Sequence, residues 1–227
     1  MAVSWKAGRN FPASASRESL KRLLGAKRRD RRDVRLAIKT YPNTNEFLPN
    51  DLQHLYFHFT GSSDLPENFD GREQWPDCPS LREIRNQGCC GSCWVFGAVE
   101  VMTDRQCILK KTQFRYSAEE PLLCIEFTED YCSGGFTEDK HFGSESYALD
   151  EDKDIMRELF EKGPITVAFE VYEDFFNYKS GVYKHVSGSY AGGHAVKCLG
   201  YGVQDVLPYY LQTASFVMKN VPPDLGG

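Results

Sequence analysis

The feature that most constrains this chain is a cysteine at the start of a long predicted helix. Residues 87–94 read Gln-Gly-Cys-Cys-Gly-Ser-Cys-Trp, and a mostly apolar run follows them. Ser92 or Gly91 can cap a helix that runs from Cys93 to about Leu109. Because apolar residues cover most of the surface of this helix, we expect it to be central and buried.

The position of Cys93 favours nucleophilic chemistry. A thiol at a helix N-terminus lies near the positive end of the helix dipole, which stabilises the thiolate. The backbone N–H groups there can bind a developing oxyanion, and the side-chain amide of Gln87 could supply a second donor. A nucleophile with two donors beside it suits acyl transfer.

Three other interpretations of the same cysteine compete with this one. A lone cysteine is usually a small buried hydrophobe. Cys90 and Cys93 also form a C-x-x-C, although the polar residues 79–87 before it do not resemble the core strand that precedes a thioredoxin-like site. A zinc site would need more ligands, and the chain has no second C-x-x-C and no His pair. We keep redox and zinc as minority alternatives and expect no metal and no cofactor.

The cysteines divide the chain of 227 residues into two parts. Residues 1–64 are basic and contain no cysteine, whereas all eight cysteines lie after residue 65. Leu65-Pro66 is a plausible boundary because proline disfavours helix in the residue before it. At 41% hydrophobic residues the chain has enough apolar material for a packed core.

Periodicity predicts the other elements. A second helix is expected at Asp150–Glu161, capped by Asp150 or Asp152 and stopped by Gly163-Pro164. Alternation predicts a half-buried strand over residues 165–171. A short helix at 16–24 and strands at 55–59, 181–186, 194–200 and 209–213 are also predicted, with breaks at Gly192-Gly193 and at Gly200 and Gly202. Helices dominate the first part of the predicted peptidase region and strands its last part. This order indicates an α+β fold of two packed subdomains.

Composition bears on compartment and partners. The net charge of -5 gives no support to a nucleic-acid partner, and we interpret the basic run 27–32 as a solvated linker. No stretch approaches the ~18 apolar residues that cross a bilayer. Met1 to Trp5 runs directly into polar sequence, so no secretory signal is evident. Eight cysteines nevertheless are typical of an oxidising compartment.

The motif around Cys93 resembles the signature of papain and the cathepsins. The blocks 69–76 (Phe-Asp-Gly-Arg-Glu-Gln-Trp-Pro), 178–183 (Tyr-Lys-Ser-Gly-Val-Tyr) and 192–195 (Gly-Gly-His-Ala) resemble cathepsin B in particular. Residues 5–11 and 20–23 are similar to the cathepsin B propeptide. The resemblance implies a papain-like, two-subdomain peptidase domain at 65–227, with a helical part at 65–136, a β-rich part at 137–227 and an inhibitory propeptide at 1–64.

The resemblance also implies roles for residues and partners. Cys93 would be the nucleophile, His194 its general base and later acid, and Gln87 an oxyanion-hole donor, so that a peptide substrate forms an acyl-enzyme. His194 alone could be an edge histidine, and His141 and His185 are taken as structural. The expected partners are a peptide or protein substrate, the propeptide in cis and cystatin-like inhibitors. The expected state is a monomer, lysosomal or extracellular.

Three departures from the family pattern weaken the expected activity. Ala214 occupies the position of the asparagine that orients the catalytic histidine, and altering the orienting residue of a serine triad costs about 10⁴ in turnover. The segment after residue 135 lacks the occluding loop of cathepsin B, so remaining activity should be endopeptidase-like. The chain stops at Gly227 without the closing strands. We expect weak or absent peptidase activity, with a non-catalytic pseudoprotease, a peptide-binding decoy or an incomplete gene product as alternatives.

The resemblance further implies two disulfides. Cys78 would pair with Cys107, and Cys90 with Cys132, and the second bridge would exclude a redox role for Cys90. Cys124 would be left unpaired. Cys89 and Cys198 lie where the family usually has other residues, so three thiols are expected to be free.

Overall fold

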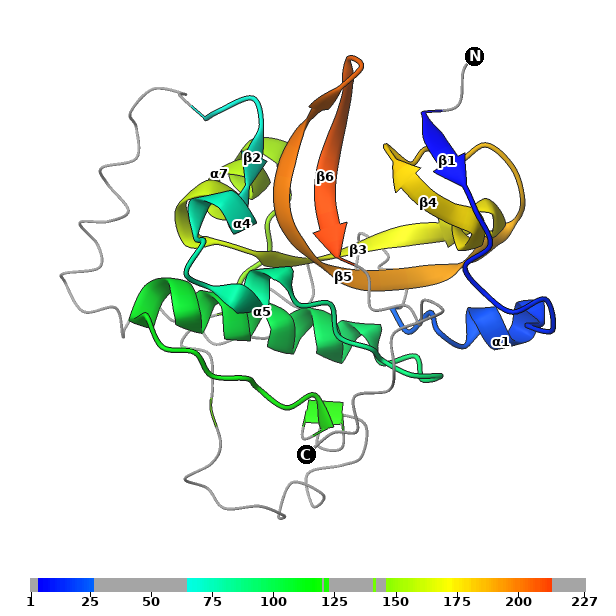
Figure 1. Cartoon of the computed structure of the whole chain (residues 1–227), viewed down its shortest axis with the longest axis horizontal. Coiled ribbons are helices and arrows are strands. Elements are labelled where there is room, and N and C mark those ends of the chain that lie inside the picture. Colours follow the sequence, from blue (N-terminus) through cyan, green and yellow to red (C-terminus); the bar gives the residue numbers. More distant parts are fainter. Residues whose placement is uncertain (1–3, 27–64, 120, 123–140, 142–145, 214–227) are drawn as a thin grey trace.

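The computed structural model describes residues 4–26, 65–119, 121–122, 141 and 146–213. In this part of the chain the helix α5 (Cys93–Lys110) lies along a curved antiparallel sheet, as Figure 1 shows. The sheet contains β2 (Phe69–Asp70), β3 (Ile165–Tyr172), β5 (Tyr190–Gln204) and β6 (Leu207–Thr213). A smaller sheet joins β1 (Trp5–Ala7) to β4 (Tyr178–Gly181). This is the α+β arrangement that the sequence predicts.

The long strand β5 organises the larger sheet. It pairs with β3 and β2 along one edge and with β6 along the other, all antiparallel. The prediction that glycines would break this strand is wrong, because β5 continues through all four of them. Two of them lie where other backbone comes close: a Cβ at Gly193 would lie 2.4 Å from the Ala26 carbonyl oxygen, and one at Gly200 2.3 Å from that of Phe69.

The helix α7 (Asp152–Lys162) closes the core on one side of this sheet. Its Leu159 is fully buried and packs with Phe69, Ile165, Cys198 and Tyr201. The prediction of a helix at 150–161 is confirmed to within two residues, although its N-cap is Glu151. The helix ends before Gly163, whose φ of 99° ordinary residues avoid.

A disulfide fixes the far end of α5. Cys107 near the end of the helix bonds to Cys78, which directly precedes the short helix η2 (Pro79–Arg82), and this confirms the first predicted bridge. The short helix α4 (Gly71–Gln74) follows β2 on the same side. The opposite end of α5, at Cys93, contacts the N-terminal segment.

The loop 182–189 differs from the prediction. A strand was expected at 181–186, but β4 ends at Gly181 because the loop turns toward Asp174 of η5 (Glu173–Asn177). The backbone N–H groups of Val186 and Ser187 donate to Asp174 Oδ2 at 2.8 and 3.1 Å. Burial alone would raise the pKa of Asp174, but these bonds and one from the Tyr183 hydroxyl lower it to about 2. These side-chain bonds replace the sheet bonds of the expected strand.

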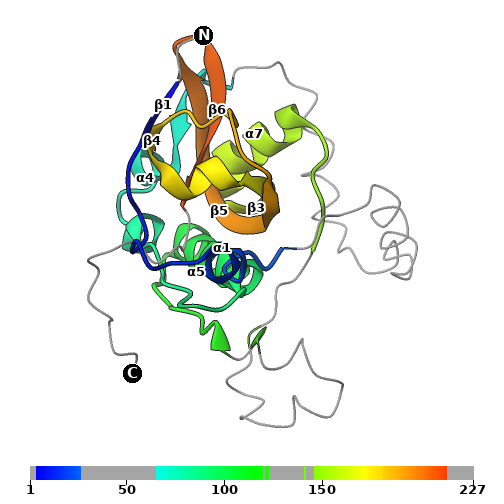
Figure 2. The same cartoon turned by 90° about the vertical axis from the view of Figure 1, so that its right-hand side faces the viewer.

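The N-terminal segment packs against the β-rich part of the molecule. β1 pairs with β4, and α1 (Arg17–Lys21) lies beside the N-terminal end of α5 in Figures 1 and 2. Ser16 caps α1 by accepting the N–H of Ser19 at 3.1 Å. The helix stops at Lys21 and not at 24, and the chain then enters the interior with Leu23 only 5% exposed. The strand predicted at 55–59 lies outside the described residues.

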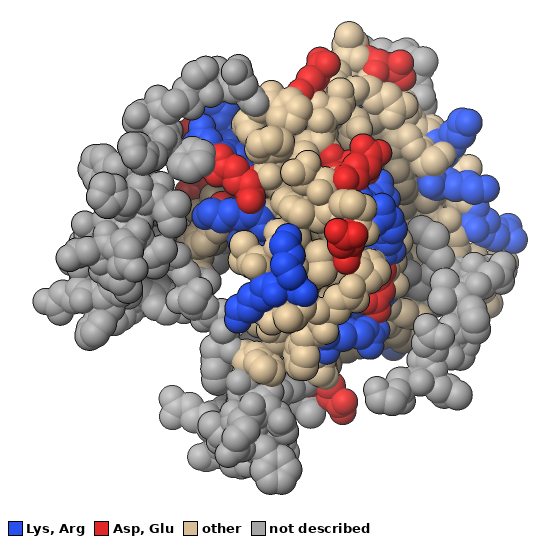
Figure 3. All heavy atoms as spheres, turned by 60° about the vertical axis from the view of Figure 1, so that its left-hand side comes forward, with Lys and Arg blue, Asp and Glu red and all other residues tan. Residues whose placement is uncertain are grey.

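Charged groups of both signs are mixed on the described surface. Figure 3 shows Lys and Arg side chains interspersed with Asp and Glu over one face, with no continuous area of one sign. No helix among the described residues is long and apolar enough to cross a membrane.

Candidate functional site

Cys93 is the first residue of α5, after the N-cap Ser92, as predicted. Its side chain is fully buried. The sulfur accepts two backbone N–H groups, from Ala195 of β5 at 3.4 Å and from Gly25 of the N-terminal segment at 3.4 Å. Ala195 directly follows His194 in the sequence. The strand β5 therefore places the residue next to the predicted histidine in contact with the predicted nucleophile.

His194 lies in the middle of the sheet, opposite Phe169 of β3. The two rings meet edge to face with their centroids 5.9 Å apart. The side chain has no exposed surface, and burial lowers the pKa of the imidazole to about 4. The ring is therefore neutral near pH 7, so it is able to accept a proton but does not hold a positive charge in this arrangement.

Gln87 is 5% exposed and aims its amide at two carbonyl groups. Nε2 donates to the Cys90 carbonyl at 2.7 Å and to the Leu23 carbonyl at 2.8 Å. The first bond fixes the loop before α5. The second shows that a peptide carbonyl from residues 4–26 already takes a hydrogen bond from the predicted oxyanion donor.

The N-terminal segment links all three predicted site residues. Leu23 bonds to Gln87, Gly25 to Cys93, and the N–H of Ala26 to the Gly193 carbonyl at 3.1 Å, next to His194. The approach at Gly25 is so close that a Cβ there would lie 1.6 Å from the Gly91 carbonyl oxygen. Only glycine fits at position 25, where the N-terminal segment passes the backbone of Gly91.

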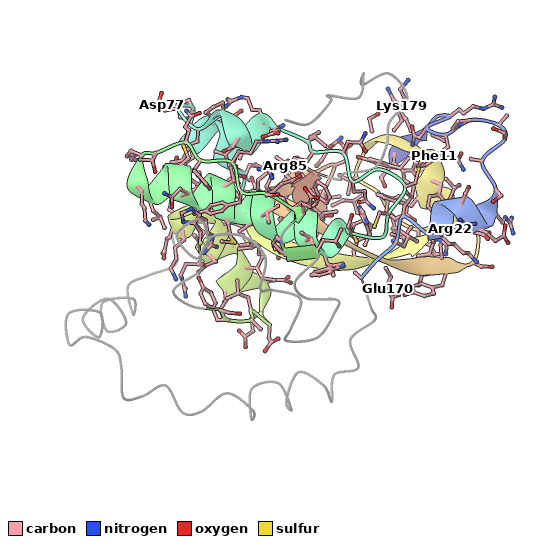
Figure 4. All side chains as sticks on the ribbon, turned by 90° about the horizontal axis from the view of Figure 1, so that it is seen from below. Phe11, Arg22, Asp77, Arg85, Glu170 and Lys179 are labelled. Atoms are coloured by element: carbon pink, nitrogen blue, oxygen red, sulfur yellow. A yellow bond between two sulfur atoms is a disulfide. The ribbon has the colours of Figure 1, made fainter. Side chains whose placement is uncertain are left out.

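Further contacts hold the N-terminal segment in place. Trp5 packs against the rings of Tyr178 and Tyr183, and its Nε1 donates to the Lys184 carbonyl at 3.0 Å. Arg17 forms an ion pair with Glu173 at 3.2 Å. Figure 4 shows Arg22 and Lys179 at one end of the molecule and Asp77, beside the disulfide, at the other. The segment therefore binds at the end of α5 that carries Cys93.

A buried group of charges behind the site was not predicted. Lys197, three residues after His194, forms an ion pair with Asp104 of α5 at 2.9 Å and donates to the Ser80 carbonyl at 3.1 Å. Both charged side chains are almost fully buried. This pair joins the helix of Cys93 to the strand of His194. The sequence carried a signal for this pair, since Asp104 lies in a largely apolar helix and Lys197 between apolar residues of a strand.

Glu100 extends this buried group by one helical turn. Burial raises the pKa of Glu100 to about 7, although the nearby Lys197 opposes the shift. Its Oε1 accepts the backbone N–H of Arg85 at 3.3 Å. Figure 4 shows Arg85 beside α5, where its guanidinium donates to Thr103 Oγ1 at 3.1 Å. The charge of Glu100 is thus sensitive to pH near neutrality.

The remaining cysteines test only part of the predicted pairing. Cys90 has no disulfide partner among the described residues, and its predicted partner Cys132 lies outside them, so this bridge stays a prediction. Cys124 also lies outside the described residues. Cys89 and Cys198 are free, as predicted, the first exposed and the second buried.

The other two described histidines have partners that the sequence did not reveal. His185 Nδ1 lies 3.1 Å from Asp174 Oδ1, and its ring stacks on Tyr172 with centroids 3.9 Å apart. His141 meets the rings of Phe114 and Tyr116 edge to face. Neither histidine contacts Cys93 in the contacts that the structure describes.

A cavity of about 700 Å³ has Phe169, the neighbour of His194, in its wall. Aromatic side chains from β3, η5, β4 and β6 dominate its lining. None of Gln87, Cys93 and His194 lines it, whereas Asn10 and Phe11 of the N-terminal segment do. Within the described residues no group of three or more His, Cys, Asp or Glu side chains could hold a metal ion.

Comparison with known proteins shows the family to which the chain is related. The model of the papain family cysteine proteases matches residues 65–142 and 136–220. The chain is 34% identical over 229 residues to cathepsin B-like cysteine proteinase 6 of Caenorhabditis elegans, covering 70% of this chain and 60% of that protein. It is 34% identical over 223 residues to a cathepsin B-like cysteine proteinase of Schistosoma japonicum, covering 68% and 65%. The chain thus spans less than two thirds of the length of these relatives.

Solved structures of precursor forms have a similar fold. Procathepsin B S9 from Trypanosoma congolense superposes with a TM-score of 0.67 at 29% identity, covering 93% of this chain and 82% of that one. The proform of the ragweed pollen protease Amb a 11 gives a TM-score of 0.62 at 17% identity, covering 95% and 72%, which shows the fold alone. These proforms support a propeptide in cis.

Proposed function

Because the chain belongs to the papain family of cysteine proteases, we propose that it is a cathepsin B-like peptidase precursor with Cys93 as its nucleophile. The observation that carries the proposal is the position of the sulfur. It lies at the start of α5 and accepts the N–H of Ala195, the residue after His194, at 3.4 Å. A helix N-terminus and a neighbouring imidazole are the two features that activate a cysteine in this chemistry.

The proposed reaction begins when the imidazole of His194 takes the proton of Cys93. The sulfur then attacks the carbonyl carbon of a peptide bond, and the amide of Gln87 and the backbone N–H at the start of α5 stabilise the negative oxygen. His194 returns the proton to the leaving amine, which gives an acyl-enzyme. A water molecule that His194 deprotonates then releases the acid and restores the thiol.

The proposed precursor state follows from the N-terminal segment. We assign residues 1–64 to a prosegment and residues 65–227 to the peptidase domain. The carbonyl of Leu23 accepts a hydrogen bond from the side-chain amide of Gln87, and the N–H of Gly25 donates one to the sulfur of Cys93. A substrate or a cystatin-like inhibitor would compete for the same groups, so the prosegment must leave before peptide bonds can be cleaved.

A second candidate function is peptide binding without turnover. The low pKa of His194, about 4, opposes a thiolate–imidazolium pair while the site is covered. Ala214, at the position of the family's orienting asparagine, lies outside the described residues, and a methyl side chain cannot accept a hydrogen bond from the ring. We therefore propose weak, endopeptidase-like turnover at most. Cathepsin B-like relatives suggest a lysosomal or extracellular setting.

Hydrolysis of a fluorogenic peptide separates the two candidates. The full chain is assayed before and after limited proteolysis between residues 27 and 64, alongside Cys93→Ala and His194→Gln. We expect turnover only after cleavage, and only in the chain that keeps both Cys93 and His194. Specific binding of the peptide to cleaved wild type, with no turnover, would favour the pseudoprotease. Turnover that survives Cys93→Ala would exclude both assignments.

A further inference from the structure

Arg85 is a buried arginine that the proposed peptidase chemistry does not use. It precedes Gln87 by two residues in the segment 83–87, which belongs to neither a helix nor a strand. Only 5% of its side chain is exposed, and burial lowers the pKa of its guanidinium, so the charged form is held there at a cost. A buried charge persists only where its hydrogen bonds offset that cost, and its partners therefore show what the residue holds.

The partners of Arg85 lie on α5 and in the chain that follows it. Its backbone N–H donates to Glu100 Oε1 at 3.3 Å, and its guanidinium donates to Thr103 Oγ1 at 3.1 Å. Glu100 and Thr103 are three positions apart, so they share one face of the helix. A second guanidinium nitrogen donates to the Tyr116 carbonyl at 2.6 Å. The backbone and the side chain of one residue are therefore both fixed to the helix that begins with Cys93, and Figure 4 shows Arg85 beside it.

Arg85 and Gln87 lie on the same side of their segment. Burial alternates along this stretch, since Arg85 and Gln87 are buried whereas Ile84 and Asn86 are exposed. Only two peptide units separate the two buried residues. On the other side of Gln87, Asn86 Oδ1 accepts the N–H of Gly88 at 2.8 Å and closes the turn. The backbone of Gln87 is thus held between Arg85 and this turn.

We propose that Arg85 and Glu100 are positioning residues that aim the side-chain amide of Gln87. Together they hold residues 85–87 against α5, so that the amide stays beside the N-terminal end of the helix, where the proposed reaction develops negative charge on an oxygen. In the structure Nε2 of this amide donates to the Leu23 carbonyl at 2.8 Å. The effect on turnover rests on the proposed function, whereas the effect on this hydrogen bond does not.

The buried ion pair next to Glu100 does not account for its carboxyl group. Lys197 already has Asp104 as its partner at 2.9 Å. Burial raises the pKa of Glu100 to about 7, and the charge of Asp104 adds to this rise, whereas Lys197 and Arg85 oppose it. Leucine would avoid the cost of burying a carboxyl group, but it offers no oxygen to the N–H of Arg85. Glutamine would keep the oxygen and remove the charge.

Alkylation of Cys93 in the uncleaved chain reports on the hydrogen bond between Gln87 and Leu23 without any turnover. Iodoacetamide reaches the buried sulfur only when the N-terminal segment opens. We expect Glu100→Leu to raise the labelling rate about fivefold, the worth of one ordinary hydrogen bond. Glu100→Gln should label at the wild-type rate, because its amide oxygen can accept the N–H of Arg85. Arg85→Met, which loses the guanidinium bonds, should raise the rate as Glu100→Leu does.

A double-variant cycle separates positioning from a general loss of stability. In a chain that already carries Gln87→Ala, Glu100→Leu should add nothing to the labelling rate, because no amide remains to be aimed. Arg105→Met is the matched control, since it removes the 2.9 Å ion pair with Glu158 from the same helix and leaves residues 85–87 unchanged. Its labelling rate should equal that of wild type. Additive effects of Glu100→Leu and Gln87→Ala would overturn the proposal, as would equally raised rates in the leucine and glutamine variants of residue 100.

Peptide hydrolysis by the chain cleaved between residues 27 and 64 tests the consequence for the reaction. Glu100→Leu should lower kcat about tenfold, less than the roughly 10²–10³-fold cost of removing an oxyanion donor, and leave KM unchanged. This split is expected because the negative oxygen is absent from the bound substrate. A fall in kcat that Glu100→Gln shares would overturn the positioning role. An absence of hydrolysis in wild type would count against the peptidase proposal, and the labelling cycle would then decide the positioning role alone.

Discussion

Replacing Gly25 by alanine should expose Cys93. A Cβ at this position would lie 1.6 Å from the Gly91 carbonyl oxygen. The obstacle is a backbone atom, so the N-terminal segment has to move away. The movement would break three hydrogen bonds, those of Leu23 with Gln87, Gly25 with Cys93 and Ala26 with Gly193. At about 1 kcal/mol for each bond, the closed arrangement loses about 3 kcal/mol, a rise of about a hundredfold in the open population.

The rate at which iodoacetamide alkylates Cys93, followed by peptide mapping, measures this population. Opening is required because the sulfur is fully buried in the closed arrangement. Gly8→Ala is the matched control, since its Cβ would meet only the flexible side chain of Lys179, at 2.9 Å. We expect rapid labelling in Gly25→Ala and an unchanged rate in Gly8→Ala. Equal rates in Gly25→Ala and wild type would show that the segment does not cover the sulfur as described.

Three further predictions concern stability. Lys197→Met leaves Asp104 buried without its partner at 2.9 Å, so we expect the free energy of unfolding to fall by about 3–5 kcal/mol and the Tm at pH 7 by roughly 6–20 °C. The double variant with Asp104→Leu should recover most of this loss. Equal losses in the single and double variants would argue against the ion pair. The pKa of Glu100 is raised from its ordinary 4.5 to about 7, so the folded state holds this proton more tightly than the unfolded state. The contribution of Glu100 to stability should therefore be greatest below pH 4.5 and fall by about 3 kcal/mol by pH 7, so in urea denaturation the difference in stability between wild type and Glu100→Gln should change by this amount between the two pH values. Removing the Cys78–Cys107 bond, with its sequence separation of 29, should cost about 3–4 kcal/mol in urea denaturation, whereas Cys89→Ser, at an exposed free thiol, should cost nothing measurable.

The parts of the fold that could be predicted from sequence are those with local causes. The start of α5 at Cys93 and the end of α7 before Gly163 follow from capping and helix-stopping residues. The half-buried strand β3 follows from the alternation of its apolar residues. These signals lie within a few residues of the elements that they determine.

The parts that could not be predicted depend on contacts between distant residues. The glycines of β5 indicate breaks when read alone, but the strand is continuous, and Gly193 and Gly200 allow the close approach of Ala26 and Phe69. The loop 182–189 leaves the sheet because Asp174 satisfies its N–H groups. The site shows the same division, since the motif identified Cys93 and Gln87, whereas the partner of Lys197 appeared only once helix and strand were brought together.

Whether Cys93 and His194 act as one reactive unit is tested most directly by the pH dependence of Cys93 labelling. The measurement uses an uncharged epoxide electrophile and compares Gly25→Ala with Gly25→Ala/His194→Gln, both open variants. An isolated thiol with a pKa of about 8.5 is almost entirely protonated at pH 6. We predict that labelling of the first variant persists at pH 6 and that loss of the imidazole slows it by about a hundredfold. Identical pH profiles for the two variants would contradict the pairing of this cysteine with this histidine.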